Sequence, residues 1–199
     1  MTTVYAVPKP AKRSAEERRL ARKRRARAAR KAKPMSRPDL IDLADKLHSI
    51  YIRAQRDGCE MHGWPHAAKE CPGRGLHPSA LQCAHGWDRG TMAVRYDPEN
   101  TYAIEMRCHA KYTRNHRQGD AQWHDWMALR LSEGIYQELR ERARPIRQWE
   151  PWELVLVIRE RLAWIAELPD TLRKEWAQER VAALDAKIRK ALESEVSHV

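Results

Sequence analysis

The stretch from residue 59 to residue 84 most constrains how this chain can fold. It is rich in Gly, Pro, His and Cys and poor in the large apolar side chains that build a core. Three of the four cysteines lie in this stretch, at positions 59, 71 and 83, and the fourth is Cys108. A segment of this composition needs an organiser other than hydrophobic packing, and a metal ion held by Cys and His is the simplest one. Residues 1–7 lack an apolar core of signal-peptide length, so we expect a cytoplasmic protein with metal ligands rather than disulfides.

The positive charge of the chain is concentrated near its N-terminus. Residues 9–37 contain fourteen Lys and Arg and two Glu, whereas the net charge of the whole chain is +11, so the remainder is close to neutral. Residues 1–35 have few large apolar side chains, which predicts a disordered or fraying helical arm that orders on a polyanion. We expect this arm to bind DNA or RNA rather than to act only as a solubilising tail. Its candidate contact residues are Arg18, Arg19, Arg22, Lys23, Arg24, Arg25, Arg27 and Arg30.

The pattern of residues 36–144 predicts a mostly helical α+β domain. Ser36 is expected to cap a helix that ends near residue 56 and carries His48 on its surface. Residues 81–106 predict two short strands, with one turn at 88–90 and a second bend at 97–100. Helices are expected from 108 to about 115 and from about 120 onward, with an interruption at Gly134.

Residues 145–199 form the third predicted region. After a break at 145–151, apolar residues at helical spacing predict helices at 152–168 and 170–196 in an antiparallel hairpin. This hairpin is expected either to pack on the preceding domain or to form a homodimer, and the sequence does not decide between them. No stretch approaches the ~20 apolar residues of a membrane span.

A set of polar residues in the predicted strand–strand–helix region has the chemistry to hydrolyse a phosphodiester bond. His85 ends the first strand, where its imidazole can act as a general base near neutral pH. The Asn100 amide can bond the backbone beside His85 and fix the loop. Arg89 and Arg95 can bind a phosphate bidentately. His109 opens the next helix and can bind a metal ion that polarises the phosphate. Each residue alone is more often structural, but the joint spacing favours a site.

This region resembles the HNH endonucleases, whose ββα-metal fold places two strands and a helix around one metal ion. It is similar in particular to phage-type members, and the phage recombination endonucleases of the Rap/NinG class, which cut branched DNA, are plausible neighbours. The resemblance covers roughly residues 50–143, with the following aromatic helix and residues 136–139 also fitting the pattern. It rests on Leu81 to His85, Arg89, Arg95, Asp97, Asn100, Cys108 and His109.

The resemblance implies roles for these residues and for a catalytic Mg²⁺ or Mn²⁺ ion. His85 would be the general base, Asn100 the loop brace and His109 a ligand of the catalytic ion. Many HNH members carry a metal ligand just before the base, where this chain has Ala84. A second ligand must then come from elsewhere, and the candidates are His116, Asp88 and Asp97.

The resemblance also implies a structural zinc ion, separate from the catalytic ion. Many members hold it with two Cys-x-x-Cys pairs, but here the corresponding segments read Cys-Glu-Met-His at 59–62 and Glu-Met-Arg-Cys at 105–108. Zinc accepts both Cys and His. We expect Cys59, His62, Cys71 and Cys108 as its ligands. Cys83 is a substitute, although a small buried apolar residue is its preferred interpretation.

Three functions follow from the sequence. The favoured hypothesis is a metal-dependent DNA endonuclease, which by its resemblance would act on branched or recombination DNA in a phage. The second is a zinc-stabilised module that binds nucleic acid without catalysis, because Ala84 leaves the catalytic metal site incomplete. The third is a protein whose C-terminal hairpin docks to a partner. The DNA structure that is cut, and whether one strand or two are cut, stay open.

Overall fold

The computed structural model describes residues 14–32, 34–64, 70–87, 89–113 and 121–193, and the chain divides into two compact units, Met1–Pro34 and Met35–Val199. The first unit contains helix α1 (Ala15–Ala32), in which Leu20 is the one large apolar residue and is 48% exposed. The helix therefore has no apolar face to bury. The predicted nucleic-acid contacts Arg19, Arg22, Lys23 and Arg24 are exposed on it, whereas the side chains of Arg18, Arg25, Arg27 and Arg30 lie outside the described part of the chain.

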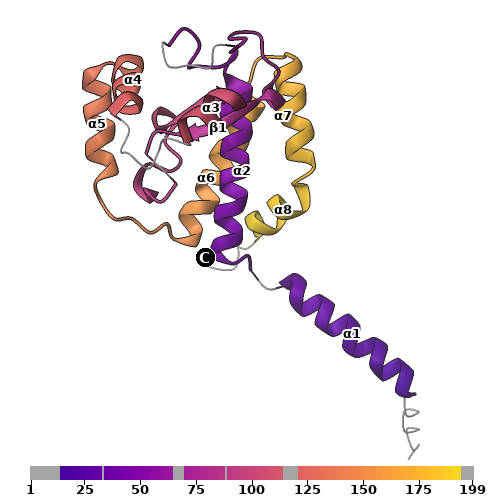
Figure 1. The fold of residues 1–199 in the computed structure, drawn as a ribbon. Coiled ribbons are helices and arrows are strands. Elements are labelled where there is room, and N and C mark those ends of the chain that lie inside the picture. Colours follow the sequence, from indigo (N-terminus) through magenta and orange to yellow (C-terminus); the bar gives the residue numbers. More distant parts are fainter. Residues whose placement is uncertain (1–13, 33, 65–69, 88, 114–120, 194–199) are drawn as a thin grey trace, which may run out of the picture. The chain divides into compact units, whose positions relative to one another are not determined.

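Helix α2 (Arg37–Gln55) runs through the middle of the second unit (Figure 1). It begins as the sequence predicts, because the Asp39 backbone N–H donates to Oγ of Ser36 at 3.4 Å. It ends at Arg56, also as predicted. Its buried residues lie on more than one face, which is the pattern of a central helix rather than of a surface one. They are Leu40, Leu43, Ala44, Leu47, His48, Ile50, Ile52 and Ala54.

The C-terminal helices share a core with α2. They are α6 (Pro151–Ala166), α7 (Leu172–Ala182) and α8 (Asp185–Glu193). Leu43 and Leu47 of α2 belong to the same buried cluster as Ile158 of α6, Trp176 of α7 and Ile188 of α8. Helices α6, α7 and α8 therefore share one hydrophobic core with α2, and the predicted boundary at residue 145 does not separate two cores.

The predicted long helix over 170–196 is wrong, because α7 and α8 are separate helices. The chain turns between them, where the Leu184 N–H donates to the Val181 carbonyl oxygen at 2.9 Å. This turn allows Leu184 and Ile188 to pack against the same cluster as Trp176. Residues 194–199 of the predicted helix lie outside the described residues.

The centre of the second unit is a two-stranded sheet followed directly by a helix, in the order that the sequence predicts. Strands β1 (Leu81–His85) and β2 (Thr101–Glu105) pair antiparallel, with Leu81 opposite Glu105 and His85 opposite Thr101. The connection contains two short 3-10 turns, Met92–Val94 and Pro98–Asn100. Helix α3 (Met106–Thr113) begins where β2 ends.

The two faces of this sheet pack against different helices. Leu81 and Cys83 of β1 lie in a small cluster with Ile52 of α2. The opposite face carries Ala84 and Tyr102, because side chains alternate along a strand. That face belongs to a second core cluster with Cys108 of α3 and with residues of α4 (Ala121–Leu131) and α5 (Glu133–Ala143), which include Trp123, Trp126, Met127 and Leu139. The sheet thus lies between α2 and the group α3–α5 (Figure 1).

The break between α4 and α5 lies at Ser132 rather than at Gly134. Ser132 has φ 71°, a left-handed conformation that ends α4, and Gly134 lies inside α5. The interruption was predicted two residues too late because Gly is the more common helix breaker. Among the described helices, none has the length and apolar content needed to cross a membrane.

Candidate functional site

Three cysteines from distant parts of the chain meet at one point. The Sγ atoms of Cys59, Cys71 and Cys108 all lie within 4.8 Å of one another. In a tetrahedral zinc site with Zn–S bonds near 2.3 Å, sulfur atoms are about 3.8 Å apart, so a small inward adjustment lets these thiols share one ion. Cys59 follows α2, Cys71 lies in the loop before β1, and Cys108 lies on α3. A metal such as zinc would therefore join three segments that are distant in the sequence.

A short antiparallel contact holds the two loop cysteines near each other. The Cys59 N–H donates to the carbonyl oxygen of Gly73 at 2.9 Å, and the Gly75 N–H donates to that of Asp57 at 2.7 Å. A Cβ atom at Gly58 would collide with the Gly73 carbonyl oxygen, so this crossing requires Gly at position 58. The glycine at position 58 thus allows two backbone segments to approach closely beside the thiols.

The third cysteine is positioned by the start of α3. One carboxylate oxygen of Glu105 accepts hydrogen bonds from the backbone N–H groups of Arg107 at 2.8 Å and of Cys108 at 3.2 Å. These N–H groups have no partner within the helix, so the carboxylate caps it. Glu105 therefore orients the backbone of Cys108.

The electrostatics of the cluster suit a metal ion. Burial, with a smaller contribution from the neighbouring Cys108, raises the pKa of the Cys59 thiol to about 12. Without a metal the thiol is therefore protonated near neutral pH. A divalent cation reverses this preference, because it stabilises thiolates and displaces their protons. The donor set of three sulfur atoms favours zinc over Mg²⁺, which prefers oxygen ligands.

Two further zinc-ligand predictions have different outcomes. His62 is exposed, and its ring lies against Gly73, 2.7 Å from where a Cβ atom of Gly73 would stand. Among the described residues the cluster contains three cysteines and not His62, so the structure does not bring this predicted ligand to the site. Cys83 packs with Ile52 and Leu81. Its preferred interpretation as a small buried apolar residue is confirmed.

Asn100 braces the connection between the strands as predicted. Its side chain is fully buried. The Oδ1 atom accepts the Trp87 N–H at 2.7 Å, and the Nδ2 group donates to the carbonyl oxygens of Trp87 at 3.2 Å and Val94 at 3.0 Å. The Gly86 N–H donates to the Asn100 carbonyl oxygen at 2.8 Å. The backbone that follows His85 is thus held on both sides by one residue.

His85 lies on the face of the sheet that packs against α2. Its ring centroid is 6.4 Å from that of His48 on α2. Burial, together with the positive charge of Arg89, lowers the pKa of His85 to about 4, although Asp45 opposes the shift. The imidazole is therefore neutral near pH 7, and a ring nitrogen keeps a lone pair that can accept a proton.

The predicted partner His109 lies on α3, directly after Cys108. This helix packs through Cys108 on the face that carries Ala84 and Tyr102. The groups that act on His85 include His48, Asp45 and Arg89. An ion shared by His85 and His109 stays a prediction.

Of the other candidate ligands of the catalytic ion, only Asp97 belongs to the described residues. Asp97 accepts the Glu99 N–H at 2.9 Å and pairs with Arg142, so it is part of the turn before β2. His116 and Asp88 lie outside the described residues. In the part of the chain that the structure describes, the cysteine cluster is the one group of three or more His, Cys, Asp and Glu residues close enough to hold a metal.

The two arginines that were predicted to bind phosphate, Arg89 and Arg95, lie in different environments. Arg95 forms a bidentate ion pair with Asp45 of α2, with Nε–Oδ1 at 2.8 Å and Nη2–Oδ2 at 2.5 Å, and it also donates to the Arg89 carbonyl oxygen. Its guanidinium ties α2 to the strand connection, which corrects the prediction that it binds phosphate. Arg89 is exposed and its charge acts on His85, and its role as a phosphate ligand stays a prediction.

A buried polar network behind His85 was missed by the sequence reasoning. His48 was predicted on the surface but is 1% exposed. Nε of the buried Arg161 on α6 donates to Nδ1 of His48 at 2.8 Å. The proton of the neutral ring is therefore on Nε2, which lies 3.1 Å from Oγ1 of Thr101. Arg161 also donates through Nη2 to the carbonyl oxygen of Tyr96 at 2.5 Å. This network connects α2, α6 and the start of β2.

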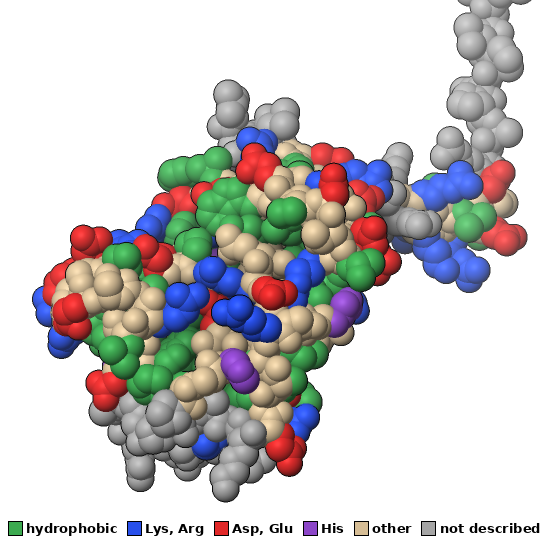
Figure 2. All heavy atoms as spheres, turned by 90° about the horizontal axis from the view of Figure 1, so that it is seen from above, with side chains coloured by type: hydrophobic (Ala, Val, Ile, Leu, Met, Phe, Trp, Pro, Cys, Tyr) green, Lys and Arg blue, Asp and Glu red, His purple; other side chains and the backbone are tan. Residues whose placement is uncertain are grey.

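A cationic hollow lies next to the cysteine cluster. It has a volume of about 300 Å³ and is lined by Arg56, Arg74 and Arg130 together with Asp57, Glu60 and His62. Glu60 pairs with Arg56 at 3.5 Å and with Arg130 at 3.1 Å. Figure 2 shows Lys and Arg side chains gathered near the middle of the upper face, with Asp and Glu side chains among them.

Comparisons of this chain with known protein-family models, with curated proteins and with solved structures find no match. Its function must therefore be argued from the site itself.

Proposed function

We propose that this protein is a metal-dependent endonuclease of the HNH type that hydrolyses phosphodiester bonds of DNA. One observation carries the proposal: His85 ends the first strand of a strand–strand–helix unit, and the buried Asn100 fixes the backbone beside it with three side-chain hydrogen bonds. A brace of this kind holds a general base in a fixed position. If His85 were only structural, its position at the end of β1 would not require an ionisable imidazole.

The residues around His85 supply two parts of such a reaction. The neutral imidazole of His85 can take the proton of an attacking water molecule. The guanidinium of Arg89 can bind a phosphate oxygen and stabilise the negative charge that develops there. The described residues do not gather the oxygen or imidazole ligands that Mg²⁺ or Mn²⁺ would need at this point, so we assign no step to that ion. Zinc at Cys59, Cys71 and Cys108 would be structural.

The arm and the cationic surfaces support DNA as the substrate. The exposed Arg and Lys side chains of α1 can bind the phosphate backbone without regard to sequence. Such binding weakens by orders of magnitude when the salt concentration rises. By resemblance to the phage recombination endonucleases, branched DNA is the substrate class to test first. A homodimer, which would allow both strands to be cut, stays a prediction.

A second candidate is a zinc-stabilised module that binds nucleic acid without cutting it. Two observations favour it. The ring of His85 lies 6.4 Å from that of His48 on α2, and Arg95 is paired with Asp45. This candidate shares the cysteine cluster and the arm with the endonuclease, so DNA binding alone does not separate the two.

Hydrolysis of supercoiled plasmid separates them. We expect the full-length protein to nick the plasmid when Mg²⁺ or Mn²⁺ is present and to leave it intact in EDTA, and to cut a branched substrate faster than the linear duplex of the same sequence. The rate should stay level when the pH is lowered from 7.5 to 5.5, because the lowered pKa of His85 keeps its imidazole neutral over this range. Binding of the plasmid without cleavage under any divalent ion would support the non-catalytic module instead.

A further inference from the structure

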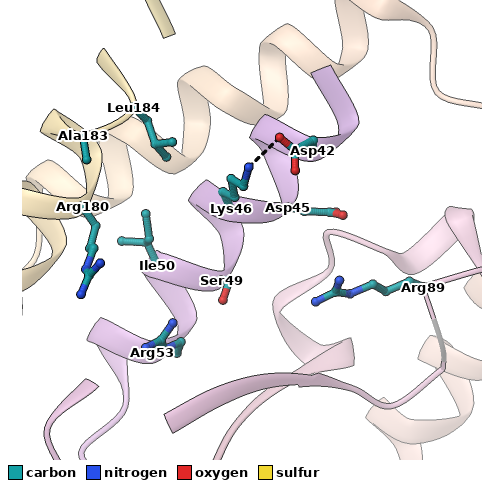
Figure 3. A pocket seen from close by; sticks show the side chains of 10 residues that line it. All are labelled: Asp42, Asp45, Lys46, Ser49, Ile50, Arg53, Arg89, Arg180, Ala183 and Leu184. Atoms are coloured by element: carbon teal, nitrogen blue, oxygen red, sulfur yellow. Dashed lines mark hydrogen bonds and ion pairs between the residues drawn. The ribbon is translucent and has the colours of Figure 1, made fainter. Parts of the chain in front are cut away.

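A cleft lies between α2, the loop after β1 and the α7–α8 turn (Figure 3). Its volume is about 400 Å³, which falls within the usual range for ligand sites of roughly 300–1,000 Å³. Helix α2 contributes one wall, and Arg89 reaches toward it from the loop that follows His85 (Figure 3). The lining residues on α2 are Asp42, Asp45, Lys46, Ser49, Ile50 and Arg53.

The carboxylates of the cleft are already neutralised by neighbouring cations. Asp42 pairs with Lys46 at 2.7 Å and with Lys187 at 3.3 Å. Asp45 is held in the bidentate pair with Arg95. The positive charges of three further arginines are therefore not balanced by acids of the cleft. These arginines are Arg53, Arg89 and Arg180.

The three arginines come from three elements and surround one space. Arg53 is fixed in place, because its Nε donates to the Pro78 carbonyl oxygen at 2.9 Å and its guanidinium lies 4.8 Å from the centre of the Trp176 ring. Arg180 lies on α7 and Arg89 on the opposite side of the cleft (Figure 3). Guanidinium groups arranged in this way favour a ligand with more than one anionic oxygen.

The cleft also has apolar surface. Ile50 of α2 and Ala183 and Leu184 of the α7–α8 turn line it, and Ser49 offers a hydroxyl. A compact inorganic anion would leave these apolar side chains without a partner. A chain of sugars and phosphates matches both kinds of surface, because its phosphates can meet the arginines while its sugars contact the apolar residues.

Arg89 belongs to the cleft and also acts electrostatically on His85. A strand bound in the cleft would contact Arg89, which lies on the loop that directly follows His85. We propose that this cleft binds the sugar–phosphate backbone of the DNA strand whose phosphate is presented to His85. The inference deepens the proposed endonuclease function and rests on it. It assigns to α7 and the α7–α8 turn a part in substrate binding that the arm does not perform.

DNA binding by charge-reversal variants tests the cleft. The full-length protein is titrated in EDTA against a short fluorescein-labelled branched DNA, and binding is followed by fluorescence anisotropy. We expect Arg180→Glu to weaken binding about ten-fold, and Arg180→Gln to reduce the slope of log affinity against log salt concentration by about one, as the loss of one phosphate contact does. The matched control is Arg140→Glu, which makes the same charge change at an exposed position on α5 and should weaken binding less than two-fold.

The outcomes separate the cleft from the proposed function. Equal weakening by Arg180→Glu and Arg140→Glu would overturn the cleft, even if the wild-type protein cuts DNA. Selective weakening by Arg180→Glu supports the cleft as a DNA site, even if the wild-type protein cuts nothing, and then only the endonuclease proposal fails. If Arg180→Glu does not fold, as judged by its melting temperature, Arg180→Gln and its salt slope decide the question.

Discussion

Replacing Cys108 with Ala is expected to abolish zinc binding and to lower the melting temperature of the protein by roughly 10–20 °C. Cys108 is fully buried on α3, and its sulfur meets those of Cys59 and Cys71 from two other segments. Metal binding at such a site contributes folding free energy directly, because the unfolded chain has no preformed site. A loss of about 5 kcal/mol corresponds to a shift of this size in a unit of this length.

The matched control for this prediction is Cys83→Ala. Cys83 is also buried and free, but it packs among apolar residues away from the cluster. Its replacement removes one buried sulfur and should cost about 1 kcal/mol. Zinc content is measured by elemental analysis of the purified proteins, and stability by thermal melting. If Cys108→Ala keeps one equivalent of zinc and melts like Cys83→Ala, the cysteine cluster does not hold zinc.

Replacing Arg161 with Met is expected to destabilise the protein by about 2–5 kcal/mol, as the loss of the donor to two buried acceptors does. Arg161 is 2% exposed and bonds His48 on α2 and the carbonyl oxygen of Tyr96. Met fills much of the same volume as Arg, so the loss of stability would come mainly from polar groups that lose a hydrogen bond. Nδ1 of His48 and the Tyr96 carbonyl oxygen would lose their donor in a place that water reaches poorly.

Arg159→Met is the matched control, because it makes the same change on the exposed side of the same helix. Its effect on the free energy of unfolding should stay within about 0.5 kcal/mol. Both variants are unfolded with urea, and the midpoints and slopes are compared. Equal stability of the two variants would show that the buried network contributes nothing to folding.

The parts of the fold that sequence reasoning predicted well depend on neighbours in the chain. Ser36 caps α2 through an amide three residues away, and the strand–strand–helix order follows from short apolar runs and turn residues. The bracing role of Asn100 depends on Trp87 and Val94, which lie within the same connection. Spacing along the chain carries this information, so local patterns were enough.

The parts that could not be predicted depend on pairs of residues far apart in the chain. Arg95 looks like a phosphate ligand until its partner Asp45, fifty residues earlier, is seen beside it. The helical pattern predicts that the side chain of His48 is exposed. Its partner Arg161 lies 113 residues later, so nothing near His48 in the sequence indicates that the side chain is buried. The break at Leu184 likewise follows from packing in the core shared with α2, and no local helix breaker causes it. Tertiary packing decided each case.

The most direct test of the endonuclease proposal is the rate of plasmid nicking by His85→Ala, measured beside the wild-type protein and His77→Ala. His77 is an exposed histidine before β1 and controls for the loss of any imidazole. Removal of a general base typically costs 10²–10⁴ in rate, so we expect His85→Ala to be slowed by at least about 100-fold, while His77→Ala cuts like the wild type. All three proteins should melt at similar temperatures. Equal nicking by folded His85→Ala and wild-type protein would contradict the assignment of His85 as the base.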